Sequence, residues 1–166
     1  IVICSGSSAG REDYTSSIIA EFGEVLVHGL AIRPGKPAIL GIIDNKPAIG
    51  VPGYPISAQL IFNIFARQVL LRKQGLPLPE ENYLPCQVSR KLASSMGVDE
   101  YIYVNVAKIR DAYIAYPLNR GAGISTSLVK ADGILHIPRG SEGLLAGESS
   151  PVALRRSRQS IDNSIV

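Results

Sequence analysis

The pattern of hydrophobic positions changes about halfway along the chain. The first four residues, Ile-Val-Ile-Cys, form an apolar run that is typical of a parallel strand with both faces covered. Apolar residues recur at helical spacing over residues 57–74, which predicts a long helix. In the second half Ile102, Val104 and Val106 alternate with more polar neighbours, as in a half-buried strand. The change of period predicts an α/β region followed by a β-rich region.

The first region is expected to contain two successive strand–loop–helix units. Apolar residues at helical spacing (Ile18, Ile19 and Phe22) predict a short helix that Asp13 or Thr15 would cap. Three further strands are expected at residues 25–32, 38–43 and 48–51.

The second region is expected to follow a linker rich in Pro and Glu at residues 76–82. A turn at Arg110-Asp111 and short strands separated by glycines indicate a small barrel or sandwich. The additional strands are expected at residues 113–116, 133–137 and 151–154. We therefore predict an incomplete parallel or mixed α/β layer over residues 1–78, a separate β-rich unit over 79–155, and a basic tail or linker over 156–166.

The composition, with 46% hydrophobic and 19% charged residues, is that of a globular protein and excludes a disordered chain. No apolar run has the length of a membrane span, and no signal-peptide pattern is present, so a cytoplasmic protein is expected. Because a natural domain seldom begins within a strand, we expect the chain to be a fragment of a longer protein.

Charge and cysteine usage point to no special chemistry. The formal net charge is +3, and the only dense basic cluster consists of Arg155, Arg156 and Arg158. No aromatic residues interleave with this cluster, which favours a solvated tail over a nucleic-acid interface. Cys4 and Cys86 lie far apart and outside any CxxC pattern, which favours reduced thiols over a disulfide or metal site.

The two histidines, His28 and His136, lie within strand patterns and have no carboxylate or cysteine neighbours at metal-ligand spacing. Packed or surface roles are therefore favoured for both. No nucleophile elbow and no Ser-His-Asp set is recognisable, so the sequence does not indicate general acid–base catalysis.

The segment Arg33-Pro34-Gly35-Lys36-Pro37 is the strongest candidate for ligand chemistry. Pro followed by Gly at its centre meets the requirements of a type II turn. Two cations beside the backbone N–H groups of a tight bend would suit a tetrahedral dianion such as phosphate, sulfate or molybdate. The alternative is an ordinary hairpin turn whose charges are solvated.

A second candidate loop, made of small residues, follows the first strand. Gly6, Ser7, Ser8 and Gly10 would allow a ligand to approach the backbone near the N-terminus of a helix. The loop lacks the spacing of a Walker P-loop or a GxGxxG fingerprint. Asp13 is either a helix cap or a carboxylate that handles a metal or an oxyanion beside this site.

The third candidate loop is Pro52-Gly53-Tyr54-Pro55, which opens the long helix. Two prolines stiffen it, and Gly53 would allow a ligand to approach closely. Ser57 is expected near the start of the helix, as its N-cap, as a ligand contact, or as both. All three loops are expected at the edge of the sheet where open α/β folds bind ligands.

Taken together, these segments resemble the molybdopterin molybdotransferases, the family of MoeA and gephyrin. The resemblance covers nearly all of residues 1–155, and the pairing of IRPGKP with VPGYP at this spacing is its most specific part. The segments GSSAG and EDYT are most similar to those of a prokaryotic branch of the family. In this branch a LysR-like substrate-binding domain sometimes follows the transferase. The matching segments are SGSSAGREDYT, HGLAIRPGKPAILG and GVPGYPISAQL in the first half, and VDEYIYVNV, YPLNRGAGISTSLVKADGILHIPRGSEG and LAGE in the second.

The resemblance implies a fold and a reaction. Residues 1–78 would be the C-terminal half of a three-layer, molybdopterin-binding α/β domain, and residues 79–155 the family's small C-terminal β domain. Family members insert molybdate into adenylylated molybdopterin with release of AMP, aided by a divalent metal, commonly Mg²⁺, and the full-length protein would be a homodimer. The fragment alone is expected to be inactive.

The resemblance also assigns roles to individual residues. Arg33 and Lys36 match the cations of the molybdate-holding turn, and Asp13 matches an acid that serves catalysis and binds the metal. The residues that would bind the cofactor precursor are Gly6, Ser7, Ser8, Gly10, Pro37, Gly53 and Ser57.

The chain departs from the family pattern at several positions. Arg33 replaces a common lysine, which keeps the charge but changes its geometry. Tyr54 stands where many relatives have Asn, and Tyr103 where many have Arg. Arg120 is our substitute candidate for a molybdate-contacting arginine. Two alternative functions stay open: a pterin adenylyltransferase of the same α/β fold, and a non-catalytic scaffold or ligand-sensing module.

Overall fold

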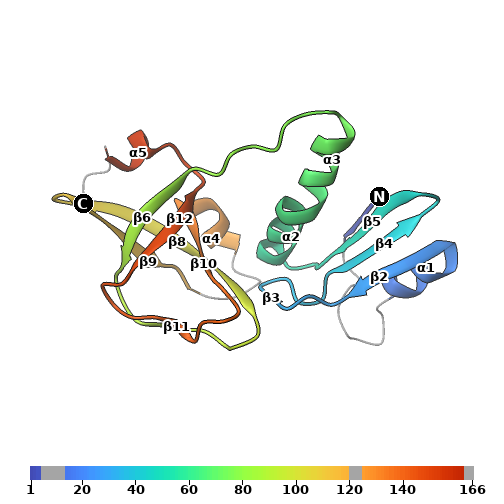
Figure 1. Cartoon of the computed structure of the whole chain (residues 1–166), viewed down its shortest axis with the longest axis horizontal. Coiled ribbons are helices and arrows are strands. Elements are labelled where there is room, and N and C mark those ends of the chain that lie inside the picture. Colours follow the sequence, from blue (N-terminus) through green and yellow to red (C-terminus); the bar gives the residue numbers. More distant parts are fainter. Residues whose placement is uncertain (5–13, 120–124, 163–166) are drawn as a thin grey trace. The chain divides into compact units, whose positions relative to one another are not determined.

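The structure is a computed structural model that describes residues 1–4, 14–119 and 125–162. Two compact units follow each other along the chain, Ile1–Pro79 and Glu80–Val166 (Figure 1). The first unit is α/β and the second is a β barrel. No helix among the described residues is both long enough and apolar enough to cross a lipid bilayer.

A four-stranded mixed sheet in the order β1-β5-β4-β2 forms the centre of the first unit. Its strands are β1 (Val2–Cys4), β2 (Gly23–His28), β4 (Ile39–Ile43) and β5 (Lys46–Val51), and the two-residue β3 (Ile32–Arg33) lies between β2 and β4 in the chain. β1 runs parallel to β5, whereas β4 is antiparallel to both β5 and β2. The expected strand over residues 25–32 therefore ends at His28, because Gly29 adopts a φ of +86° and turns the chain.

Helix α1 (Thr15–Phe22) covers one face of this sheet. Its fully buried Ile19 lies so close to Gly41 of β4 that a Cβ on that glycine would be 2.5 Å from Ile19 Cγ2. Ile19, Ile39 and Ala48 form the core on this face. The N-cap of α1 is Tyr14, which makes no side-chain capping bond. The predicted Thr15 cap is therefore wrong, and the alternative cap, Asp13, lies outside the described residues.

Ile49 and Val51 of β5 are buried and point away from the face that carries Ala48. The long helix lies beside β5 (Figure 1). This helix consists of α2 (Pro55–Ile61), a π-helical segment η1 (Phe62–Ala66) and α3 (Arg67–Lys73). The π segment, in which the Arg67 N–H bonds to the Phe62 carbonyl five residues earlier, was not apparent from the spacing of apolar residues. Helices on both faces of the sheet give the three layers.

The second unit is a five-stranded closed barrel. Its strands are β6 (Tyr83–Val88), β8 (Asp99–Ile109), β9 (Ala112–Pro117), β10 (Gly133–Ile137) and β12 (Ser149–Leu154). They follow the order β10-β12-β6-β9-β8, and β10 pairs back with β8, which closes the barrel. The short strands β7 (Leu92–Ala93) and β11 (Gly143–Leu144) pair with each other beside it. The expectation of a β-rich second half is confirmed, and of the two forms considered, barrel and sandwich, the structure shows the barrel.

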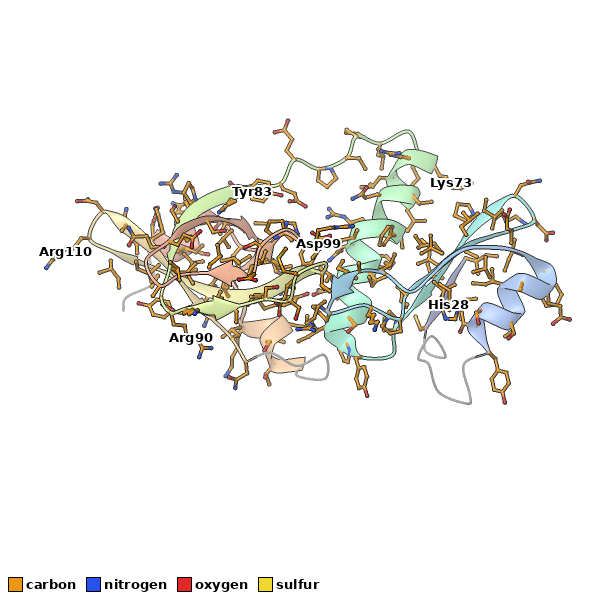
Figure 2. The ribbon with its side chains drawn as sticks, turned by 60° about the horizontal axis from the view of Figure 1, so that its bottom comes forward. His28, Lys73, Tyr83, Arg90, Asp99 and Arg110 are labelled. Atoms are coloured by element: carbon orange, nitrogen blue, oxygen red, sulfur yellow. The ribbon has the colours of Figure 1, made fainter. Side chains whose placement is uncertain are left out.

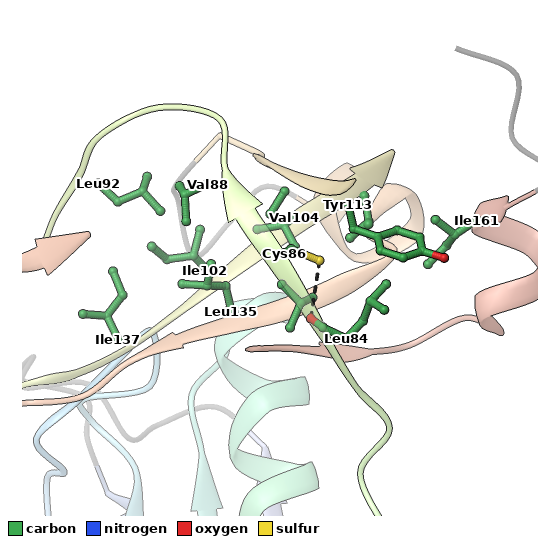
Figure 3. Close-up of a cluster of buried hydrophobic side chains, with 13 residues drawn as sticks. Leu84, Cys86, Val88, Leu92, Ile102, Val104, Tyr113, Leu135, Ile137 and Ile161 are labelled. Atoms are coloured by element: carbon green, nitrogen blue, oxygen red, sulfur yellow. Dashed lines mark hydrogen bonds between the residues drawn. The ribbon is translucent and has the colours of Figure 1, made fainter. Parts of the chain in front are cut away.

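The barrel interior is filled by the alternating residues of its strands (Figure 3). Ile102, Val104 and Val106 face inward on β8 as their alternation predicted. Cys86 is also buried there, and burial raises the pKa of its thiol to about 11, so that it stays protonated at neutral pH. Both cysteines are free thiols, and Cys4 is exposed.

The arginines that follow β12 bind the end of helix α4 (Ser125–Lys130). Arg155 Nη1 donates to the Leu128 carbonyl at 2.6 Å, and Arg156 Nη2 donates to the Val129 carbonyl at 3.0 Å. Positive charge at a helix C-terminus is favourable because the last carbonyls of the helix lack backbone partners. The side chains remain exposed, as expected of a solvated tail, but the sequence did not indicate these contacts.

Helix α5 (Arg158–Asp162) attaches the end of the described chain to the barrel. Its Ile161 is buried in the barrel core (Figure 3). Tyr113 of β9 donates from its hydroxyl to Asp162 Oδ1 at 2.5 Å and accepts from Arg158 Nε at 3.1 Å. Residues beyond β12 therefore contribute to the barrel.

Ile161→Ala should destabilise the barrel unit by about 2–5 kcal/mol, because it removes a fully packed side chain and leaves a cavity. Urea unfolding followed by tyrosine fluorescence measures the change. Leu145→Ala is the matched control, since Leu145 is 63% exposed and its truncation should change stability by less than about 0.5 kcal/mol. Equal stability of the two variants would show that α5 is not part of the barrel fold in solution.

Candidate functional site

Three loops reach one edge of the α/β sheet. The parallel pairing of β1 with β5 places Cys4 beside Val51, so the loops that follow these strands start next to each other. β4 runs in the opposite direction, and its first residue, Ile39, pairs with Gly50. The turn that precedes β4 therefore ends at the same edge, which is the position at which α/β sheets bind ligands.

Backbone hydrogen bonds close the turn between β3 and β4. The Gly29 N–H donates to the Ala38 carbonyl at 2.9 Å, and the Leu30 N–H donates to the Lys36 carbonyl at 2.7 Å. Gly35 has a φ of +120°, in the left-handed region that favours glycine. The bond that closes a four-residue turn joins Ala38 N to Gly35 O at 3.0 Å, so the tight bend lies two residues later than predicted.

The long helix holds this turn from one side. A Cβ on Gly35 would lie 2.7 Å from Cδ1 and 2.9 Å from Cγ1 of Ile61, so the helix occupies the space that a side chain would need. Ser57 precedes Ile61 by four residues, which places both on one face of α2, one helical turn apart. The structure therefore brings the turn of Arg33 and Lys36 and the helix face of Ser57 together.

The loop after β5 leads directly into this helix. Tyr54 is the N-cap of α2 and Pro55 occupies its first turn, so the interpretation of Ser57 as the N-cap is wrong. Ser57 lies in the first turn and is only 3% exposed. Gly53 and Tyr54 are exposed at the mouth of the loop.

The two cations of the turn are available to a ligand. Arg33 and Lys36 are exposed, and within the described part of the chain no carboxylate lies within ion-pair distance of either. Pro37, which lies between Lys36 and β4 in the chain, is half-buried. The arrangement offers positive charge and backbone N–H groups to an anion, and the described part of the site contains no carboxylate that would repel it.

Several predicted site residues lie outside the described residues. These are Gly6, Ser7, Ser8, Gly10, Asp13 and Arg120. Their assignment as ligand-binding, catalytic or metal-binding residues stays a prediction. Among the residues that are described, no three His, Cys, Asp or Glu side chains gather in a metal-binding arrangement.

The histidines lie where packed or surface roles were expected. His28 is exposed at the end of β2 (Figure 2). His136 stacks on Tyr101 with ring centroids 4.6 Å apart, and its Nε2 lies 3.0 Å from Asp99 Oδ1. Burial works to raise the pKa of the Asp99 carboxyl, but hydrogen bonds from Arg139 and His136 outweigh it and lower the pKa. Local spacing could not indicate the Asp99 partner, because it is 37 residues away from His136.

Tyr103, which departs from the family pattern, is buried in the second unit. The Arg155 guanidinium lies over its ring, 5.5 Å from the centroid. Burial, the larger effect, raises the pKa of the Tyr103 hydroxyl, and the charge of Arg155 partly opposes the change. Arg155, which directly follows β12, thus holds a positive charge beside Tyr103.

Sequence reasoning missed the contribution of Ile61. It was assigned only to the apolar stripe of the long helix, where its spacing placed it. Contact between residues 35 and 61 joins separate elements, and no local pattern signals it. The only available sign was the glycine, because a glycine at a turn often marks a close approach of other atoms.

Comparison with known protein families agrees with this architecture. Residues 1–72 match the family model described as a probable molybdopterin binding domain. Residues 83–154 match the model described as the MoeA C-terminal region, domain IV. The two matches correspond to the α/β unit and the barrel unit.

Individual relatives extend the match over most of the chain. A molybdopterin biosynthesis protein of Methanocaldococcus jannaschii is 33% identical over 93% of this chain and 36% of its own length. Molybdopterin molybdenumtransferase 1 of Mycobacterium tuberculosis is 24% identical over 92% of this chain and 38% of its own length. The crystal structure of the molybdopterin biosynthesis moea protein from Pyrococcus horikosii superposes with a TM-score of 0.74 at 36% identity, covering 94% of this chain and 37% of that chain. The chain thus spans a little over a third of the length of these relatives.

Proposed function

The chain belongs to the MoeA family of molybdenum cofactor biosynthesis proteins, and we propose that its α/β unit carries the molybdate site of a molybdopterin molybdotransferase. In the proposed reaction the enzyme inserts molybdate into adenylylated molybdopterin and releases AMP. One observation carries the proposal: Gly35 packs on Ile61 and so holds a turn with two cations beside the helix face of Ser57.

The proposed role of the site is positional and electrostatic. Arg33 and Lys36 neutralise the charge of the oxyanion, and the buried Ser57 hydroxyl hydrogen-bonds it or the cofactor precursor. Gly53 and Pro37 line the approach of the precursor at the same sheet edge. Such a site needs no covalent enzyme intermediate, in agreement with the lack of a recognisable nucleophile set.

The remaining parts of the proposal come from the family resemblance. Molybdopterin-AMP and molybdate are the substrates, the full-length protein is a cytoplasmic homodimer, and Asp13 serves turnover and binds Mg²⁺. The small residues Gly6, Ser7, Ser8 and Gly10 approach the precursor. Asp13, the proposed metal ligand, lies outside the described residues.

Lys36→Ala in the full-length protein should weaken molybdate binding about tenfold to a hundredfold, since a charge-assisted contact contributes about 1.5–3 kcal/mol. Isothermal titration with molybdate, in the presence of adenylylated molybdopterin, measures the dissociation constant. Lys46→Ala is the matched control: Lys46 is also exposed but begins β5, and therefore lies at the opposite end of that strand from the site. If Lys36→Ala and Lys46→Ala bound molybdate equally well, the turn would be structural, and a scaffold function would replace the enzyme.

Asp13→Asn should separate turnover from binding. Removing a negative charge near a dianion leaves molybdate affinity unchanged or tightens it, whereas the carboxylate is needed for turnover in this proposal. Cofactor formation from adenylylated molybdopterin and molybdate, measured beside the molybdate dissociation constant, distinguishes the two effects. A variant with unimpaired turnover would remove Asp13 from the catalytic set.

A further inference from the structure

We infer that Ile61 is a positioning residue of the oxyanion site: its side chain fixes the Arg33–Pro37 turn relative to Ser57. The inference rests on the proposed function for the identity of the ligand. The packing itself stands independently of that function, because it is a property of the described residues alone.

The contact is direct and lies within one unit. The Cδ1 and Cγ1 atoms of Ile61 occupy the position of a Cβ on Gly35, at 2.7 and 2.9 Å, and Ile32 Cγ2 lies 3.4 Å from the same position. Gly35 is buried and Ile61 has no exposed surface. The turn is thus held between the terminal carbons of Ile61 and the side chain that precedes Arg33.

The packing of Gly35 supplements the backbone hydrogen bonds of the turn. Its residues are tied to the neighbouring chain by the Gly29, Leu30 and Ala38 amide bonds, all of which lie at the base of the loop or in its last bend. The two side chains that carry charge are exposed and make no ion pairs with described residues. The packing of Gly35 is therefore the contact through which the long helix fixes the backbone positions of these two residues.

Helix α2 links the position of the turn, through Ile61, to the position of Ser57. Ile61 is the last residue of α2 and shares a helix face with Ser57, four residues earlier. Directly after Ile61 the π segment begins, which inserts an extra residue per turn and rotates the following side chains away from that face. The face that carries Ser57 and Ile61 is therefore limited to α2.

Ile61→Val provides the test, because it removes the δ carbon nearest to Gly35 and leaves a β-branched side chain. Loosening one or two residues of the turn should weaken molybdate binding by the full-length protein about fivefold to thirtyfold. Hydrogen–deuterium exchange of the Leu30 and Ala38 amides should become faster. In cofactor formation the KM for molybdate should rise, whereas kcat should stay within about twofold.

The matched control is Ile19→Val. Ile19 is equally buried and packs on a glycine, Gly41, but on the face of the sheet covered by α1. It should change molybdate affinity by less than about twofold and leave the exchange of both amides unchanged. Ile61→Leu keeps a δ carbon and should restore most of the affinity.

The outcomes separate the two proposals. If the unmodified protein fails to bind molybdate, the proposed function is wrong, and the amide exchange of Ile61→Val against Ile19→Val still decides the positioning role. If Ile61→Val matches Ile19→Val in both affinity and amide exchange, Ile61 is only a core residue and the inference is overturned.

Discussion

The parallel pairing of β1 with β5 is the constraint on which the site depends. Parallel strands begin at one edge and end at the other, so the loops after Cys4 and Val51 must leave the sheet together. A single antiparallel strand, β4, then brings the cationic turn to the same edge from the opposite chain direction. If β4 were parallel to β5, the turn that precedes it would lie at the far edge, and Arg33 and Lys36 could not meet Ser57.

Sequence patterns predicted the elements whose signals are local. Alternation located β8, and helical spacing located the long helix. Strand β6 was missed although Leu84, Cys86 and Val88 alternate as a strand requires, because a proline normally argues against a strand interior. In the barrel Pro85 lies opposite Pro151, and β9 pairs only with Gln87 and Val88. Neither neighbouring strand needs a hydrogen bond from the backbone N–H that Pro85 lacks. This follows from the pairing of the strands and cannot be read from the local sequence.

The contacts that could not be predicted all join distant segments. Arg155 and Arg156 looked like solvent-exposed charges, because the helix end that they bind, in α4, is about 27 residues away. Ile161 is one apolar residue in a polar segment and forms no periodic pattern. The candidate site shows the same limit. Spacing and composition selected the turn and Ser57, but the packing of Gly35 on Ile61 that brings them together requires the tertiary fold.

The cations of the chain illustrate why a charged residue alone does not identify a binding site. Arg139 is held by Asp99 through a contact of 2.6 Å, and Arg156 is paired with Asp132 at 3.2 Å, so their charges are already balanced. Lys46 has no carboxylate partner among the described residues, but it follows the exposed hairpin tip of Asp44 and Asn45 and lies at the opposite end of β5 from the site. Lys36 combines both requirements. No carboxylate among the described residues pairs with it, and its backbone neighbours a glycine buried against Ile61, so an anion that binds there need not first order the turn. Rigid placement of an uncompensated charge, and not charge as such, is what makes this turn the part of the chain best suited to hold an oxyanion.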